Sequence, residues 1–211
     1  MKKLTAVFIA IMVLISALPA FAEPISENGF TYTLRGDAAV IQAYTGMDEE
    51  VTIPATLGGF SVEAIAQNAF WGTQIRAIEF PSSLRAIGNN AFSCSALESV
   101  SLPEDFVEMA PYAFAASPAL KDVTIPEGVF VIPNMAFGEC SSLVCVNLPS
   151  TIRRIEDAAF ISCAALTDIA LPEGLAEIED TVFYGCAALK TLALPDSITA
   201  IGEDVFTAVR T

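Results

Sequence analysis

Apolar residues recur along this chain about every 22 or 23 residues, in three columns that keep the same register. The first column is a phenylalanine, at Phe70, Phe92, Phe114, Phe137, Phe160, Phe183 and Phe206. The second is an apolar residue followed by proline, at residues 53–54, 80–81, 102–103, 125–126, 148–149, 171–172 and 194–195. The third is Ile65, Ile87, Met109, Ile132, Ile155, Ile178 and Ile201. Such a period predicts a solenoid, in which each repeat is one coil stacked on the next.

Each repeat contains an alternating segment, a proline and a return segment. In one central repeat, the apolar residues Val146 and Leu148 stand at alternate positions, which predicts a short strand with one buried face. Pro149 then ends the strand, because proline cannot donate to a ladder of hydrogen bonds. Ile152 and Ile155 point inward on the return path, and the polar stretch that leads to Phe160 is long enough for a single helical turn.

The shared pattern is Cys-x-x-Leu-x-x-Val/Ile-x-Leu-Pro-x-x-Leu/Ile-x-x-Ile-x-x-x-Ala-Phe, and it resembles the BspA-like class of bacterial leucine-rich repeats over residues 51–206. The resemblance implies a right-handed leucine-rich repeat solenoid of β-rich or α/β coils, with about seven repeats of 22–23 residues. It also implies that parallel strands line a concave side where partners dock. Proteins of this class are often adhesins or binders of host-matrix and cell-surface proteins.

The first 22 residues are typical of a secretory signal peptide. Lys2 and Lys3 precede an apolar run over residues 4–18, and Ala20-Phe21-Ala22 fits a cleavage site, so we expect cleavage after Ala22. The alternative, an uncleaved membrane anchor, requires a longer apolar run. We therefore expect a secreted or cell-surface protein that has no contact with the membrane after cleavage.

Residues 23–49 predict an N-terminal β-hairpin cap, and residues 50–211 the repeat domain. Residues 30–34 and 39–44 are strand-like runs, with Arg35-Gly36-Asp37 as the turn between them. This hairpin would cover the apolar end of the first coil. An insertion at residues 57–60 of the first repeat predicts a second hairpin loop. At the other end, either residues 208–211 cover the last coil or its apolar face is exposed and can self-associate.

The net charge of −15 excludes nucleic acid and anionic lipid as partners, because the chain offers no basic surface to either. The five cysteines allow disulfides in an exported protein. However, Cys94, Cys140, Cys163 and Cys186 lie two or three residues after the repeat phenylalanine, which indicates a column of small buried side chains. A Cys140–Cys163 disulfide between adjacent coils stays open as an alternative.

No motif in the chain predicts catalysis, a metal or a cofactor. There is no histidine, which excludes histidine-based nucleophile activation and imidazole metal clusters. Carboxylates recur after the prolines, at Glu104, Glu127, Glu173 and Asp196, where an open edge of the array does not provide the paired acids of a glycosidase.

The candidate partner-binding surface consists of the outward strand positions on either side of the buried valine or isoleucine. The candidate residues are Glu79, Ser99, Ser101, Asp122, Thr124, Asn147, Asp168 and Thr191. Seven strands spaced by about 4.8 Å would present roughly 430 Å², about half of what a standard interface buries on each partner. This area predicts weak or multivalent binding. Candidate accessory aromatic contacts, which could also pack against neighbouring coils, are Trp71, Phe130 and Tyr184.

These features predict a non-catalytic module for protein–protein interaction or adhesion, with an extracellular or host protein as its partner. Two alternatives remain. One is a structural solenoid that self-associates through its C-terminal coil. The other is a protein that binds or acts on a glycan.

Overall fold

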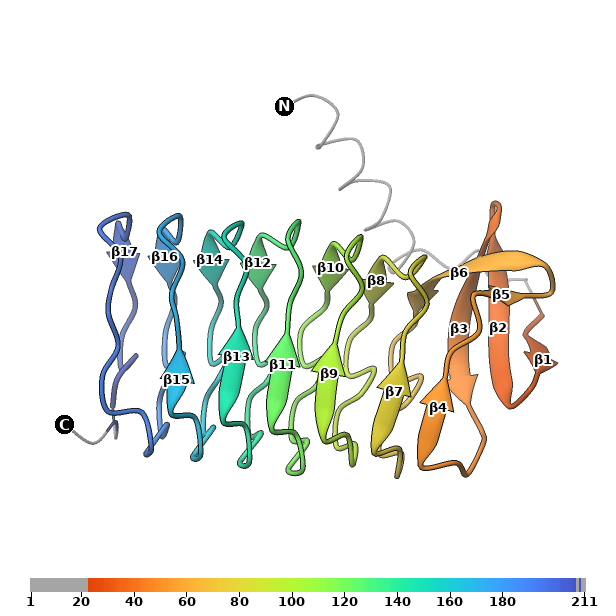
Figure 1. The fold of residues 1–211 in the computed structure, drawn as a ribbon, viewed down its shortest axis with the longest axis horizontal. Coiled ribbons are helices and arrows are strands. Elements are labelled where there is room, and N and C mark those ends of the chain that lie inside the picture. The colour runs from red at the N-terminus through yellow and green to blue at the C-terminus, as the bar shows by residue number, and fades with distance from the viewer. Residues whose placement is uncertain (1–22, 208, 210–211) are drawn as a thin grey trace.

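The structure is a computed structural model that describes residues 23–207 and 209, and the expected signal peptide lies outside this part of the chain. The chain winds into a stack of coils whose short strands lie on two opposite sides (Figure 1). Strands and turns make up the described residues, which contain no helix. The solenoid predicted from the three columns is therefore confirmed, but the helical turn expected in each coil is wrong.

One side of the stack, called the strand face, carries the strands that precede the repeat prolines. They are β4 (Glu50–Thr52), β7 (Ala77–Glu79), β9 (Ser99–Ser101), β11 (Asp122–Thr124), β13 (Cys145–Asn147) and β15 (Asp168–Ile169). These strands are parallel and form two sheets, β4-β7 and β9-β11-β13-β15. The break between β7 and β9 falls where the buried strand residues Ile78 and Val100 lie 22 residues apart, whereas those of β9, β11, β13 and β15 lie 23 apart. The strand expected around Thr191 is absent, in a coil that has a described neighbour on one side only.

The opposite side carries the strands that end at the third apolar column. They are β8 (Ala86–Ile87), β10 (Glu108–Met109), β12 (Val131–Ile132), β14 (Arg154–Ile155), β16 (Glu177–Ile178) and β17 (Ala200–Ile201). The ladder is interrupted between β10 and β12. In other coils the residue after the column donates its backbone N–H to the preceding coil, as Ala110 does to Ile87 at 2.8 Å. Pro133 stands at this position in the coil of β12 and has no N–H to donate.

A hairpin cap covers the N-terminal end of the stack, as the sequence predicts. It consists of β1 (Ile25–Glu27), β2 (Phe30–Arg35) and β3 (Ala38–Tyr44), and it continues into β6 (Phe60–Ile65), which β5 (Thr56–Leu57) joins in a second hairpin. The Tyr44 ring stacks on Phe70 with centroids 5.5 Å apart. The cap therefore shields the apolar face of the first coil.

The repeat phenylalanines form one continuous column through the core. Neighbouring ring centroids lie 4.8–6.2 Å apart, with planes within 17° of parallel. The first six rings are fully buried, whereas Phe206 in the last coil is 37% exposed. The inward direction predicted for this column is therefore confirmed, and the stacking weakens at the C-terminal end.

Two left-handed residues in most coils make the bends where a helical turn was expected. One lies two residues before the repeat phenylalanine, with φ between 53° and 60°, at Asn68, Asn90, Tyr112, Met135, Ala158, Thr181 and Asp204. The other lies two residues after it, at Gly72, Cys94, Ala116, Glu139, Ser162 and Gly185. Left-handed residues reverse the chain within a few positions, so that each coil closes without a helix.

Three of the four cysteines assigned to one column lie in it. Cys140, Cys163 and Cys186 are buried, and each thiol donates to the carbonyl oxygen of the phenylalanine one coil earlier, at 3.1–3.2 Å. The placement of Cys94 was wrong, because this residue occupies the exposed left-handed position and Ser95 fills the buried slot. All five cysteines are free, so the structure contains no Cys140–Cys163 disulfide.

Candidate functional site

The strand face brings seven of the eight candidate binding residues onto strands. Its strands alternate between exposed and buried positions, because successive side chains point to opposite sides. The pairing register gives one row through Ser99, Asp122, Cys145 and Asp168, and a second through Ser101, Thr124 and Asn147. Glu79 lies on β7, opposite Thr52. Thr191 is exposed but lies on no strand.

The polar groups of this face are only partly used within the protein. Asn147 Nδ2 donates to Thr124 Oγ1 at 3.3 Å, and Thr52 Oγ1 donates to Glu79 Oε2 at 3.0 Å. By contrast, the following side chains make no hydrogen bond within the described residues: Ser99, Ser101, Asp122 and Asp168. The face therefore offers short hydroxyl and carboxylate groups to a partner without first breaking internal contacts.

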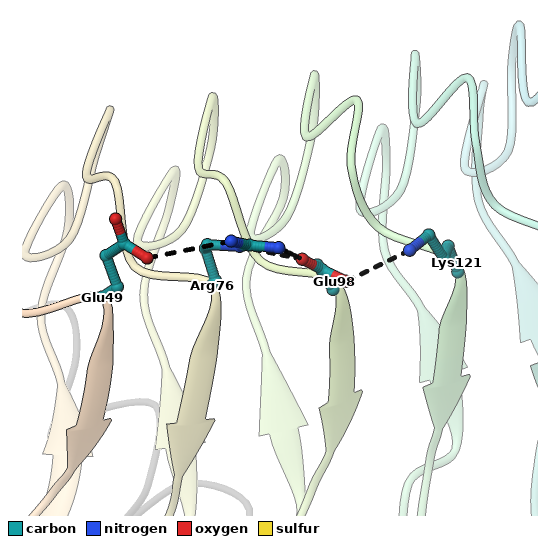
Figure 2. Close-up of polar contacts among 4 residues, drawn as sticks. All are labelled: Glu49, Arg76, Glu98 and Lys121. Carbon is teal, nitrogen blue, oxygen red and sulfur yellow. Dashed lines mark hydrogen bonds and ion pairs between the residues drawn. The ribbon is translucent and has the colours of Figure 1, made fainter.

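A ladder of alternating charges runs along the edge of the strand face, across four coils (Figure 2). Arg76 lies between Glu49, at 3.8 Å, and Glu98, which also pairs with Lys121 at 3.1 Å. Hydrogen bonds from Arg76 and then Lys121 lower the pKa of the Glu98 carboxyl. This ladder was not predicted, although its signal is present in the sequence: the residue just before each strand alternates in sign over four repeats.

The three candidate aromatic contacts lie apart from the strand face and from one another. Trp71 and Tyr184 follow buried phenylalanines at the corner of the first and sixth coils, and they are 60% and 40% exposed. Phe130 precedes β12 on the opposite side and is half-buried. The structure therefore does not combine these rings into one site.

The described carboxylates either face solvent or join neighbouring coils. Glu104 and Glu173 are exposed, whereas Asp157 Oδ1 accepts the backbone N–H of Asp180, one coil on, at 3.0 Å. Glu108 differs, because its Oε2 is buried with no hydrogen-bond partner among the described residues, and burial raises its pKa.

Within residues 23–207 and 209 no group of three or more acidic, cysteine or histidine side chains could hold a metal ion. A search of the same residues for a helix that is long and apolar enough to cross a membrane finds none.

A family model described as "BspA type Leucine rich repeat region (6 copies)" matches residues 49–144 and 130–210. Among solved structures, the chain is similar to the T. pallidum leucine rich repeat protein TpLRR. The two are 32% identical, with a TM-score of 0.82 over 88% of this chain and 89% of that one.

Two longer proteins are also similar in structure. A leucine-rich repeat protein from Eubacterium ventriosum is 25% identical, with a TM-score of 0.79 over 89% of this chain and 50% of that one. A leucine rich cell surface protein from Faecalibacterium prausnitzii is 26% identical, with a TM-score of 0.63 over 89% of this chain and 56% of that one. The chain thus spans about half the length of these two proteins. None of the curated proteins matches it.

Proposed function

This chain belongs to the BspA-type leucine-rich repeat family, and we propose on that basis that it is a secreted or cell-surface module for protein binding and adhesion. Repeat proteins of this family are typically non-enzymatic binding modules. One structural relative is described as a cell surface protein. The apolar leader that ends at Ala22 is typical of export, which supports a place outside the cell.

The observation that carries the proposal is the pair of regular polar rows on the strand face. The parallel pairing of the strands fixes the backbone spacing of these rows, so a partner meets short side chains at set intervals. Glu79, Asp122 and Asp168 make the face acidic, which favours a partner with basic side chains. Because the face is small, we expect each contact to be weak and adhesion to depend on several copies.

Binding of the exported chain to a panel of purified extracellular-matrix proteins tests this function. Thr124→Arg places a long cationic side chain in the middle of the strand face and should reduce binding. Ser141→Arg introduces the same side chain at an exposed position outside the strands and should preserve it. Absence of saturable binding to any protein of the panel, or equal losses in both variants, would reject the strand face as the docking surface.

A second candidate function is self-association through the last coil, where three apolar side chains of the described chain are exposed: Leu194, Ile201 and Phe206. The opposite end differs, because Tyr44 covers Phe70 there. Sedimentation of the exported chain over a range of concentrations should show a dimer that Ile201→Asp dissociates. A single monomeric species at every concentration would exclude this function.

A further inference from the structure

The corner of the first two coils carries an exposed indole beside four side-chain amides. We call this group the amide corner, and it consists of Trp71, Gln67, Asn68, Asn89 and Asn90. The backbone N–H of Asn68 donates to the Asn89 carbonyl oxygen at 3.0 Å, and that of Trp71 to the Asn68 carbonyl oxygen at 3.1 Å. These bonds place the backbones of the two amide pairs on adjacent coils, about 4.8 Å apart, with Trp71 one turn after Asn68.

The fold does not use these amide groups. None of the four side-chain amides makes a hydrogen bond within the described residues. Gln67 and Asn68 are exposed, whereas Asn89 and Asn90 are half-buried. A Cβ added to Gly72, the residue after Trp71, would meet no atom of a more distant residue within 4 Å, so the space at this glycine is open.

Later coils use the equivalent side chains to hold the stack together. At the position of Gln67 and Asn89 they carry Asn134 and Asp180, among others. Asn134 Nδ2 donates to the Asp157 carbonyl oxygen at 2.8 Å, and Asp180 Oδ1 accepts the Glu203 backbone N–H at 2.7 Å. In the first two coils the side chains at this position make no such hydrogen bond within the described residues, so their amides are free for a ligand.

Backbone conformation favours the other two amides but does not require them. Asn68 and Asn90 occupy the left-handed position, where asparagine is favoured. However, Tyr112, Met135 and Thr181 adopt the same conformation in later coils. The position therefore tolerates other side chains, and among the described coils asparagine occupies it in the coil of Trp71 and in the next one.

The amide corner is also electrically neutral, although the chain as a whole is strongly acidic. Residues 66–75 and 88–97 include no charged residue, in a chain with 25 acidic and 10 basic side chains. A cationic or anionic ligand would find no charged partner there. An indole packs its flat face against an apolar ring face, and amides donate to and accept from hydroxyl groups.

We propose that the amide corner is a binding site for a neutral glycan, with Trp71 stacked on one sugar ring and the amides bonded to its hydroxyl groups. This inference goes beyond the proposed protein-binding role, because it uses a surface separate from the strand face. Failure of glycan binding therefore leaves protein docking intact, and the reverse also holds.

Intrinsic fluorescence of the exported chain tests the proposal directly, because Trp71 is the only tryptophan. We expect a saturable shift of its emission to shorter wavelength when β-1,4-linked glucose or N-acetylglucosamine tetrasaccharides are added. Heparin, an anionic polysaccharide, should cause no such shift. A spectrum that stays unchanged with both neutral tetrasaccharides, or that shifts only with heparin, would overturn the proposal.

Variants locate the site. The double variant Asn68→Gly/Asn90→Gly removes two amides and keeps the left-handed backbone accessible, so it should fold normally and bind about ten-fold more weakly. Trp71→Ala should abolish binding measured by calorimetry. Tyr184→Ala, the matched control at the same position of the sixth coil, should change the affinity by less than about two-fold. Equal weakening by Tyr184→Ala, or unchanged affinity in the double variant, would place the glycan elsewhere and refute the amide corner.

Discussion

The phenylalanine column predicts that one substitution costs different amounts of stability at different places in the array. Phe137 is fully buried, and the rings of Phe114 and Phe160 each lie 5.6 Å from its centroid. Phe137→Ala loses this burial and leaves a cavity, so it should lower the free energy of unfolding by about 3–5 kcal/mol. Phe206 is 37% exposed and, among the described residues, stacks on the ring of Phe183 alone, at 6.2 Å. Phe206→Ala should therefore cost about 1–2 kcal/mol.

Urea unfolding of the exported chain, followed by circular dichroism, measures both losses. The slope of free energy against urea concentration must be compared between variants, because a destabilised interior coil can divide the array into two units that unfold separately. Phe137→Leu is a suitable control, because it keeps much of the apolar volume and should cost on the order of 1–2 kcal/mol. Equal losses for Phe137→Ala and Phe206→Ala, with unchanged slopes, would refute the view that each ring is stabilised by its neighbours on both sides.

Three further predictions concern the bends, the cysteines and the charge ladder. Thr181→Asn should stabilise the chain by about 0.5–1 kcal/mol in the same unfolding assay, because a β-branched residue is strained at φ 55° and asparagine is not. A thiol reagent at pH 8 should modify exposed Cys94 in the folded protein. The three column cysteines should react only after unfolding, since burial raises the pKa of two of them to about 12: Cys140 and Cys186. Glu98→Gln should destabilise at neutral pH, and the difference should vanish as pH falls through the lowered pKa of Glu98 in the folded state, where the wild type also loses the charge.

The solenoid could be predicted because the same physical requirement recurs in every coil. An inward phenylalanine such as Phe114 stacks on the rings of both neighbouring coils. A smaller side chain in one repeat would therefore leave a cavity against both of these rings. The hairpin cap was predictable for a related reason. The first coil needs a cover, and the strand pattern that ends at Tyr44 supplies an aromatic ring for it.

The interruptions of the ladders were harder to predict, because each depends on a single position. Pro133 breaks the ladder between β10 and β12. This effect can be recognised only once the equivalent residues of the other coils are seen to donate their backbone N–H groups. The Cys94 error has the same origin. A shift of one residue exchanges a buried slot for an exposed left-handed one, and the period alone does not distinguish the two.

The binding surfaces are least determined by the repeat, and this follows from what the repeat requires. A column residue that joins coils, such as Asp157, accepts a hydrogen bond from the next coil. The stacking of the coils therefore requires a side chain that can accept this bond. A polar residue without such a bond, such as Ser101 on the strand face or Gln67 in the amide corner, is free of that requirement. A polar side chain that the fold leaves unpaired at the surface loses no internal hydrogen bond when a partner binds. Recognition is therefore favoured at positions whose side chains do not join one coil to the next.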